Sequence, residues 1–246
     1  MDVILERLSG DGSLTVADIA EAVGASTATI RRDLEHLAQQ GLLSRTHGGA
    51  VSQGVMYELP LQYKSDRQKA EKRRIASAAA ALVSDGDAVG LTGGTTTLEV
   101  ARALVGRQNL TVVTNALNIA SEVAVRPSVK LLVTGGFARS ESYELVGSFA
   151  EETLSRIYLD IAFTGVDGIS ADCGLTSHHE VEAHTNRVLI ERARRVVVVA
   201  DSSKIGRSTF AQICALNRVG ELITDAAADD NLVGRLRDAG VNVSTV

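Results

Sequence analysis

The feature that most constrains the fold is a regular alternation of short apolar runs with helical stretches, from residue 86 to the end of the chain. The apolar runs are continuous stretches of valine, leucine and isoleucine, which is typical of strands buried on both faces. Strands that alternate with helices in this way predict an α/β fold with a mainly parallel sheet, covered on both sides. The predicted strands span residues 88–91, 110–114, 129–134, 161–165, 196–200, 222–224 and 241–246, and the predicted helices span residues 97–104, 116–125, 148–157, 180–193 and 229–239.

The first fifty residues follow another pattern, that of two short helices joined by a tight turn. Residues 15–18 have the Thr-x-x-Asp form of a capping box, and Gly24 ends the helix that follows them. Ser26 is a good N-cap for a second helix, which Gly41 ends. This order is typical of a helix-turn-helix, in which the second helix lies in the major groove of DNA. The apolar residues that we expect to be buried here are Ile4, Leu5, Leu8, Val16, Ile19, Ala20, Val23, Ile30, Leu34 and Leu37.

The second helix directs arginine and small polar side chains away from its apolar stripe. Arginine suits guanine edges or phosphate, and threonine near a helix start suits phosphate or a thymine methyl group. Residues 42–51 then alternate and turn at a Gly-Gly pair, which predicts a hairpin wing that reaches the DNA backbone or minor groove. The alternative is a helical hairpin whose arginines pair with nearby acids. The predicted DNA-contacting residues are Ser26, Thr27, Thr29, Arg31, Arg32, Arg45 and His47.

Residues 52–63 lack hydrophobic periodicity and mark a domain boundary. We therefore predict a winged helix-turn-helix domain at 1–52, a linker at 53–69 and an α/β domain at 70–246. A run in which basic residues outnumber acidic ones begins the first helix of the larger domain. Such a run is usually a solvated helix face, with contacts to phosphates as the alternative. Its basic residues are Lys64, Arg67, Lys69, Lys72, Arg73 and Arg74.

Residues with hydrogen-bonding groups follow several predicted strands. The clearest case is TGGTTT at residues 92–97, a strand-to-helix turn whose glycines admit a ligand and whose helix start offers free N–H groups to an anion such as phosphate. Ligands bind beyond the carboxyl ends of the strands in such sheets, so we expect one shared site, although each residue alone suits a turn or cap equally well. The predicted effector-binding residues are Gly93, Gly94, Thr95, Thr96, Thr97, Thr114, Asn115, Gly135, Gly136, Asp160, Asp167, Glu182 and Lys204.

Composition narrows the classes of function. With no tryptophan, four phenylalanines and four tyrosines, the chain is poorly suited to stacking on single-stranded nucleic acid, and a net charge of -5 allows only a small DNA-reading face. The two cysteines match no metal site, and the histidines at 178, 179 and 184 lack zinc spacing, so we expect no metal. We find neither an apolar stretch of membrane-spanning length nor a signal peptide, which predicts a cytoplasmic protein without a membrane partner.

Residues 26–34, STATIRRDL, followed by RTHGGA at 45–50, closely resemble the N-terminal signature of the DeoR family of bacterial transcriptional regulators. The resemblance continues through residues 94–97, 160–169, 174–176 and 201–206. It implies a sensor domain similar to ribose-5-phosphate isomerase and glucosamine-6-phosphate deaminase. It also implies a repressor of a carbohydrate-metabolism operon that binds double-stranded operator DNA and a phosphorylated sugar, needs no cofactor, and forms a homodimer or homotetramer.

Two details of the sensor motifs depart from the family. The family commonly has Asp-Ser-Gly-Thr-Thr-Thr at the phosphate loop, where this chain has Thr92 and Gly93 before Gly94. Within the acidic stretch after residue 176, we align the ligand-facing glutamate with Glu182, and Glu180 is the rival. The alternative function is a sugar-phosphate isomerase or deaminase with a DNA-binding appendage, whose acid and base would come from Asp160, Asp167, Glu182 and Lys204.

Overall fold

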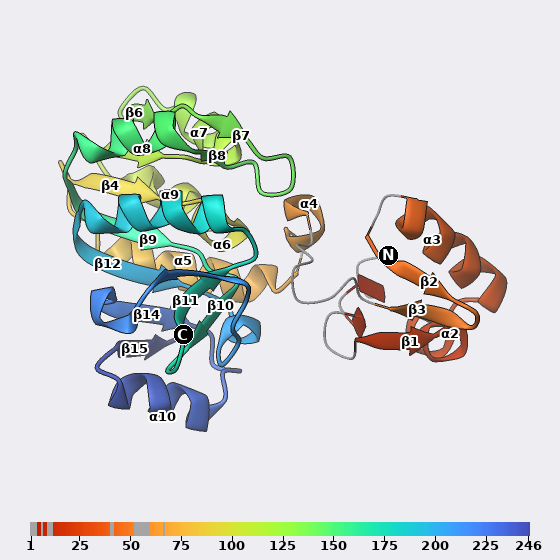
Figure 1. Ribbon diagram of the computed structural model, residues 1–246. Helices are drawn as coiled ribbons and strands as arrows, with labels where there is room; N and C mark the ends of the chain where they lie inside the picture. Colours follow the sequence, from red (N-terminus) through yellow and green to blue (C-terminus); the bar gives the residue numbers. More distant parts are fainter. Residues whose placement is uncertain (1–3, 6, 9–11, 40–41, 52–59, 66) are drawn as a thin grey trace. The chain divides into compact units, whose positions relative to one another are not determined.

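The computed structural model describes residues 4–5, 7–8, 12–39, 42–51, 60–65 and 67–246 (Figure 1). The chain divides into two compact units, with the boundary between residues 59 and 60. Of the interval that the sequence predicts as a linker, residues 60–65 and 67–69 therefore belong to the second unit. None of the described helices is both long enough and apolar enough to cross a membrane.

The first unit is the predicted winged helix-turn-helix. Residues 4, 5, 7 and 8 are helical, and α2 (Val16–Val23) and α3 (Thr27–Gln39) follow. The capping box is present, because Asp18 N–H donates to Thr15 Oγ1 at 3.2 Å, and Gly24 ends α2 in the left-handed conformation. Strands β2 (Ser44–Thr46) and β3 (Gly49–Val51) form the wing. A third strand, β1 (Ser13–Thr15), pairs with β3. The predicted helix end at Gly41 lies outside the described residues.

The second unit is built on a seven-stranded sheet in which every neighbouring pair is parallel, as predicted. The order is β15-β14-β12-β9-β4-β5-β6, so the chain begins the sheet in its interior and extends it in both directions. Such crossovers bring the carboxyl ends of all the strands to one edge. The strands are β4 (Ala88–Leu91), β5 (Thr111–Thr114), β6 (Lys130–Val133), β9 (Leu159–Thr164), β12 (Ala193–Val199), β14 (Glu221–Thr224) and β15 (Asn242–Thr245).

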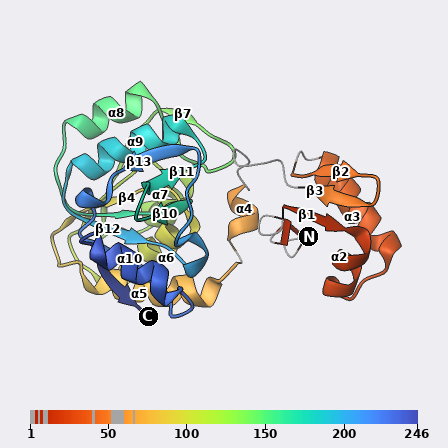
Figure 2. The same ribbon diagram turned by 60° about the horizontal axis from the view of Figure 1, so that its bottom comes forward.

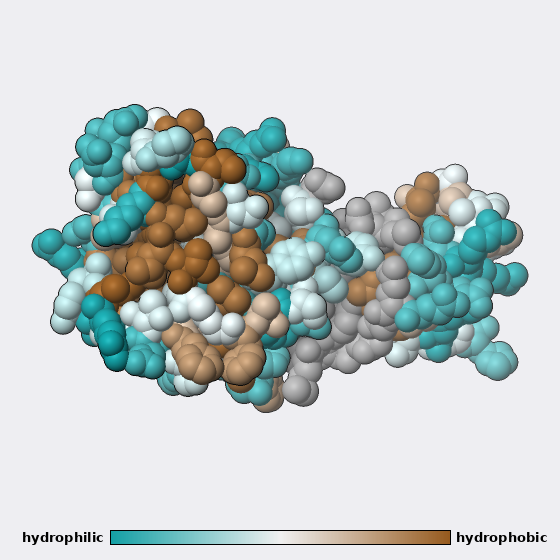
Figure 3. Space-filling model, turned by 90° about the horizontal axis from the view of Figure 1, so that it is seen from above, coloured by the Kyte–Doolittle hydropathy of each residue, from teal (hydrophilic) through white to brown (hydrophobic). Residues whose placement is uncertain are grey.

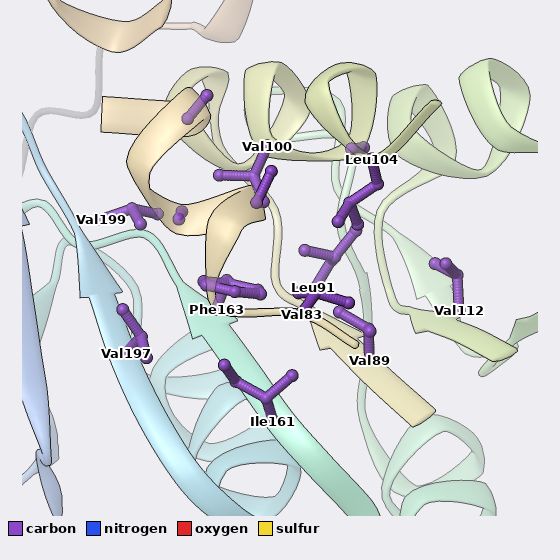
Figure 4. Close-up of a cluster of buried hydrophobic side chains, with 14 of the residues drawn as sticks. Val83, Val89, Leu91, Val100, Leu104, Val112, Ile161, Phe163, Val197 and Val199 are labelled. Atoms are coloured by element: carbon purple, nitrogen blue, oxygen red, sulfur yellow. The ribbon is translucent and has the colours of Figure 1, made fainter. Parts of the chain in front are cut away.

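Helices cover both faces of the sheet (Figures 1 and 2). The unit has a hydrophobic core on each face of the sheet, because side chains along a strand point alternately to the two faces. In β12, Val197 and Val199 pack into one core, and Val196 and Val198 pack into the other. Figure 4 shows Ile161 and Phe163 in the first of these cores, together with Val199. The helices are α5 (Lys69–Ala81), α6 (Thr95–Ala103) and α7 (Leu117–Ala124) on the first face, and α8 (Ser148–Ser155), α9 (Glu180–Glu191) and α10 (Asp230–Asp238) on the second.

Several short elements, which the sequence pattern does not predict, surround the carboxyl edge of the sheet. They include the helix α4 (Leu61–Lys64), the hairpin of β7 (Phe137–Ala138) and β8 (Leu145–Val146), and a small antiparallel sheet. The small sheet consists of β10 (Gly168–Ser170), β11 (Gly174–Ser177) and β13 (Ala211–Cys214). The pairs β7–β8 and β10–β11 have no helix between their strands, so they fall outside the strand-helix alternation that predicts the large sheet. Short 3₁₀ turns lie at Leu104–Gly106, Ser202–Lys204 and Leu216–Arg218.

We predict that Phe163→Ala destabilises the second unit by about 3–5 kcal/mol, because Phe163 is fully buried between β9 and the helices of the first face. Urea denaturation followed by circular dichroism measures the loss. Phe210→Ala is the matched control, since Phe210 is 53% exposed, and should change stability by less than about 0.5 kcal/mol. Equal losses in the two variants would contradict this packing.

Candidate effector site and DNA-reading surface

Threonine hydroxyls tie together the ends of the three central strands. After β4, Thr92 Oγ1 accepts the N–H of Gly165 at 3.1 Å and lies 3.4 Å from Thr164 Oγ1, at the end of β9. At the end of β5, Thr114 Oγ1 donates to the Leu91 carbonyl at 2.8 Å. The ends of β4, β5 and β9 therefore form one polar edge, as the sequence predicts.

The turn after β4 presents backbone amides at the start of α6. Gly94 has a φ of 131°, which residues with a side chain rarely adopt. Its carbonyl accepts the N–H of Leu98 at 3.1 Å, which is the first hydrogen bond of α6. The N–H groups of residues 95–97 come before Leu98 and therefore have no carbonyl partner within the helix. Thr97 Oγ1 donates back to the Gly94 carbonyl at 3.0 Å. The amides and the helix dipole together favour an anion at this point.

A buried glutamate that the sequence analysis missed lies over this turn. Glu144 is 2% exposed, and its Oε2 accepts from Asn115 Nδ2 at 3.2 Å and from Asn186 Nδ2 at 3.1 Å. Asn115 Nδ2 also contacts Asn186 Oδ1 at 3.0 Å, and no described residue donates a hydrogen bond to Asn115 Oδ1. A Cβ atom on Gly93 would lie 2.2 Å from Glu144 Oε1. The predicted Asn115 thus takes part in a network with two residues that no motif identifies.

Asp167 is the centre of the charged part of the site. Its Oδ1 lies 3.2 Å from Lys64 Nζ and 3.8 Å from Lys204 Nζ, while Oδ2 accepts from Ser177 Oγ and from the N–H of His178, each at 3.4 Å. Burial alone would raise the pKa of Asp167, but the two ammonium groups hold that pKa well below its usual range. Burial also lowers the pKa of Lys204, and Asp167 opposes this effect. The two ammonium groups therefore favour the ionised form of the Asp167 carboxylate.

Glu182 extends the cluster, whereas its rival Glu180 does not. Glu182 is buried, accepts from Arg139 Nη1 through Oε2, and receives a hydrogen bond from Ser177 Oγ at 3.2 Å. Because Ser177 also contacts Asp167, the two carboxylates share one neighbour. The side chain of Glu180 is 65% exposed at the start of α9. Of the two glutamates, Glu182 is therefore the one that lies close to Asp167.

The basic run at residues 64–74 does not form the uniformly solvated face that its sequence predicts. Lys72 is 3% exposed, and its ammonium donates to the carbonyls of Lys64 at 2.8 Å and Arg67 at 2.6 Å. Burial lowers the pKa of Lys72 to about 8, although the nearby Asp201 carboxylate opposes the shift. Arg73 remains exposed. The run divides because Lys72 lies on the same face of α5 as the buried Ile75.

Asp160 was wrongly assigned to the site. It is the second residue of β9, and its Oδ2 accepts the N–H of Ala88 at the start of β4, at 2.9 Å. The amino ends of parallel strands lie at the opposite edge of the sheet from the carboxyl ends. Asp160 therefore caps a strand and is separated from Asp167 by the length of β9.

The glycines after β6 have a visible packing role. Gly136 has a φ of 118°, and a Cβ atom there would lie 2.7 Å from the Val146 carbonyl oxygen. Gly135 also has a positive φ, of 75°. The pair lets the chain turn from β6 into the β7–β8 hairpin, at the edge strand of the sheet.

The seven residues predicted to contact DNA are all exposed in the first unit. Ser26 begins α3, because its Oγ accepts the N–H of Thr29 at 3.2 Å. Arg31 and Arg32 lie on the exposed side of α3, since the fully buried Ile30, Leu34 and Leu37 occupy the other side. The remaining contacts that we predict come from Thr27 at the start of α3, Arg45 on β2 and His47 in the wing turn.

No group of histidine, cysteine or carboxylate side chains suited to a metal ion occurs in the part of the chain that the structure describes. His179 has a structural role instead. Its Nδ1 accepts the N–H of Val181 at 3.3 Å and caps the start of α9.

The buried ammonium of Lys72 generates a prediction on pH. Its pKa is about 8 in the folded protein and 10.5 in a model peptide, so the unfolded chain binds more protons between these values and stability rises with pH. We compare the free energy of unfolding of the wild type with that of Lys72→Met at each pH. The difference, wild type minus variant, should rise by about 2 kcal/mol between roughly pH 7.5 and 9.5. Urea titrations at several pH values measure this difference, and a flat difference would place Lys72 in solvent.

Comparison with known proteins identifies both units. The DeoR-like helix-turn-helix domain matches residues 1–54, and the DeoR C-terminal sensor domain matches residues 67–226. The putative aga operon transcriptional repressor of Escherichia coli O157:H7 is 38% identical over 246 residues, which cover 99% of this chain and 91% of that protein. The glycerol-3-phosphate regulon repressor of Escherichia coli K12 is 33% identical over 235 residues, 96% of this chain and 93% of that protein.

Among solved structures, ribose 5-phosphate isomerase A from Methanocaldococcus jannaschii aligns with 54% of this chain and 52% of its own, at 22% identity and a TM-score of 0.40. The two domain matches occur in the order of the two structural units, and relatives above 30% identity span nearly the whole chain. This chain therefore belongs to the DeoR family of transcriptional regulators, with a helix-turn-helix DNA-binding domain followed by a sensor domain.

Proposed function

We propose that this chain is a repressor of a carbohydrate-metabolism operon, and that a phosphorylated sugar bound at the strand ends of the second unit controls its binding to operator DNA. The observation that carries the proposal is the gathering of three lysines around two aspartates. The ammonium groups of Lys64 and Lys204 contact the Asp167 carboxylate, and the Asp201 carboxylate attracts the ammonium group of Lys72. At Asp167 itself, two ammonium groups face one carboxylate, which favours an anion there.

The site also suits the rest of a sugar phosphate. Gly165, two residues before Asp167, lies against Gly94, so the lysine cluster and the free amides at the start of α6 are neighbours. Ammonium groups and amides bind phosphate, while the carboxylates of Asp167 and Glu182 accept hydrogen bonds from hydroxyl groups. A relative named for the glycerol-3-phosphate regulon supports the same class of ligand.

We favour a regulator without catalytic activity or cofactor, acting in the cytoplasm where operator DNA is found. Sugar-phosphate isomerisation needs a carboxylate base that can take a proton. The lowered pKa of Asp167 makes it a weak base, and Asp160 lies at the wrong edge of the sheet. These observations argue against Asp160 and Asp167 as the catalytic base, and they leave Glu182 and Lys204 of the four candidate groups.

The control that we propose is a shift between two populations. A ligand that binds one arrangement of the sensor domains more tightly favours that arrangement, and with it the spacing of the paired DNA-reading units. Helix-turn-helix proteins read two half-sites related by a two-fold axis, so an even number of chains is needed, either a homodimer or a homotetramer.

We propose that the second copy docks on the edge strand β6 and the apolar face beside it. Figure 3 shows apolar side chains gathered on one face of the second unit. Phe137 and Phe149 are 70% and 63% exposed, and their ring centroids lie 6.1 Å apart. Antiparallel pairing of β6 with its copy would place Lys130 opposite Val133 and the intervening leucines opposite each other, so that no like charges meet. A symmetric apolar edge of this kind fits another copy of the same chain.

A thermal-shift panel of glycerol 3-phosphate, fructose 6-phosphate and glucosamine 6-phosphate, with inorganic phosphate as reference, tests the ligand class. At about one hundred times its dissociation constant, a bound ligand adds about 2.7 kcal/mol of stability. We expect at least one phosphorylated sugar to raise the melting temperature of the wild type. We expect no comparable shift in Lys204→Ala, which nevertheless binds DNA of its own promoter region. A normal shift in Lys204→Ala would show that the ligand binds elsewhere.

In the same assays, Arg32→Ala should lose promoter binding at least tenfold and keep the thermal shift, because Arg32 lies on the exposed side of α3. Arg194→Ala, at an 85% exposed position of the second unit, is the matched control and should bind promoter DNA normally. Undiminished DNA binding by Arg32→Ala would contradict the proposed reading surface.

The docking proposal predicts that Phe137→Asp converts the oligomer to a smaller species, because the new charge would be buried at the contact. Light scattering after size exclusion measures the mass, and Phe210→Asp is the control at an exposed aromatic that directly precedes β13 of the small antiparallel sheet. A monomeric wild type, or an unchanged mass in the variant, would exclude this surface as the contact.

A further inference from the structure

The short helix α4 (Leu61–Lys64) joins the two parts of the protein along the chain. It begins one residue after Pro60, the first residue of the second unit, and the DNA-binding unit ends at residue 59. α4 is therefore the first described helix of the second unit after the DNA-binding unit. The sequence places this segment in a linker, and the structure places it in the second unit.

The contacts that hold α4 in place include three sets, two of which end at the candidate effector site. Lys64 Nζ donates to Asp167 Oδ1 at 3.2 Å. The N–H of Leu61 donates to the Glu141 carbonyl at 2.7 Å, on the loop that carries Glu144 and Arg139, the partner of Glu182. The third contact, from Lys72 Nζ to the carbonyls of Lys64 and Arg67, fixes the far end of α4 to α5.

The charges around Asp167 make the Lys64 contact exchangeable. Asp167 carries one negative charge and faces two ammonium groups, from Lys64 and Lys204. Both lysine side chains are mostly buried, at 18% and 26% exposed, so their attraction to an incoming anion is only weakly screened by solvent. A phosphate or an acidic sugar at this point competes with Asp167 for the same ammonium groups.

We propose that Lys64 is the residue that reports effector binding. It belongs both to the site and to the segment that leads to the DNA-binding unit, so an anion that attracts Lys64 away from Asp167 shifts α4. Of these three contacts, the one from Lys64 to Asp167 is the one that an anion competes for, since the other two are made to backbone carbonyls. This inference rests on the proposed function, because it assumes that the anion binds at Asp167 and Lys204.

A purely structural role for Lys64 makes a different prediction. Loss of an ion pair that only stabilises the fold would lower the melting temperature but leave both promoter affinity and its response to ligand unchanged. A reporting role requires promoter affinity itself to change, because removal of the Lys64 side chain frees α4 as the ligand does. Coupling between two sites typically changes affinity by about 5- to 150-fold.

The test compares Lys64→Met with Arg73→Met, a change of the same type at a residue of α5 that is 65% exposed and outside the site. Promoter affinity of the full-length chain is measured by fluorescence anisotropy, without additive and with each phosphate of the thermal-shift panel. We expect Lys64→Met to shift promoter affinity about tenfold without additive, and to respond no further to any phosphate. Arg73→Met should behave as the wild type.

Two further variants separate reporting from a folding defect. Lys64→Arg keeps the charge and should restore the phosphate response, while Asp167→Asn removes the other partner and should reproduce the promoter affinity of Lys64→Met. Promoter affinity of Lys64→Met equal to that of the wild type would overturn the proposal, whether or not a phosphate binds. If no phosphate shifts the wild type, the proposed effector class is wrong. A changed promoter affinity in Lys64→Met would then still support coupling through α4.

Discussion

The carboxylate of Asp167 is the contact on which the arrangement of the sensor unit depends. It follows the central strand β9, and it holds Lys204 from beyond β12, Ser177 from the small antiparallel sheet and Lys64 from α4. A mostly buried charge is tolerated only when partners compensate its lost hydration. Here each partner comes from a different element, so the requirement to neutralise one carboxylate brings together four segments that are distant in the sequence.

The parallel sheet was predictable because its strands are buried on both faces and its helices recur between them. The α3 helix was predictable for a related reason, since one apolar stripe and a serine cap are local signals. The small sheet of β10, β11 and β13, the β7–β8 hairpin and β1 gave no such signal. The β7–β8 and β10–β11 pairs are hairpins without an intervening helix, and β1 and β13 pair with strands that are distant in the sequence.

The candidate site was predictable where its residues lie at or just beyond the end of a strand, because topology then fixes the edge at which they lie. Thr92 directly follows β4, Thr114 is the last residue of β5, and Asp167 lies three residues beyond β9. Asp160 does not lie at such an end, because it precedes the apolar part of its strand, and the same topology takes it to the other edge. Residues that reach the site from irregular segments or from mid-helix, such as Glu144 and Asn186, had no positional signal at all.

The basic run at residues 64–74 shows why charge patterns alone are ambiguous. Lys72 and Arg73 are adjacent in sequence, yet one is buried and the other exposed, because α5 turns its faces by about 100° per residue. The helical phase is visible in the sequence, since Ile75 lies three residues after Lys72. The sequence does not show that the Lys72 ammonium donates to the backbone carbonyls of Lys64 and Arg67. These hydrogen bonds compensate the lysine for the loss of water on burial.

The departure of this chain from the family pattern at the phosphate loop has a structural cause. A side chain at position 93 would place its Cβ atom 2.2 Å from Glu144 Oε1 and 2.4 Å from Glu144 Cγ. A side chain at this position would therefore require Glu144 to move from the place where Asn115 and Asn186 hold it. The chain lacks the usual aspartate at position 92, and a carboxylate from the hairpin loop occupies the space over the same turn.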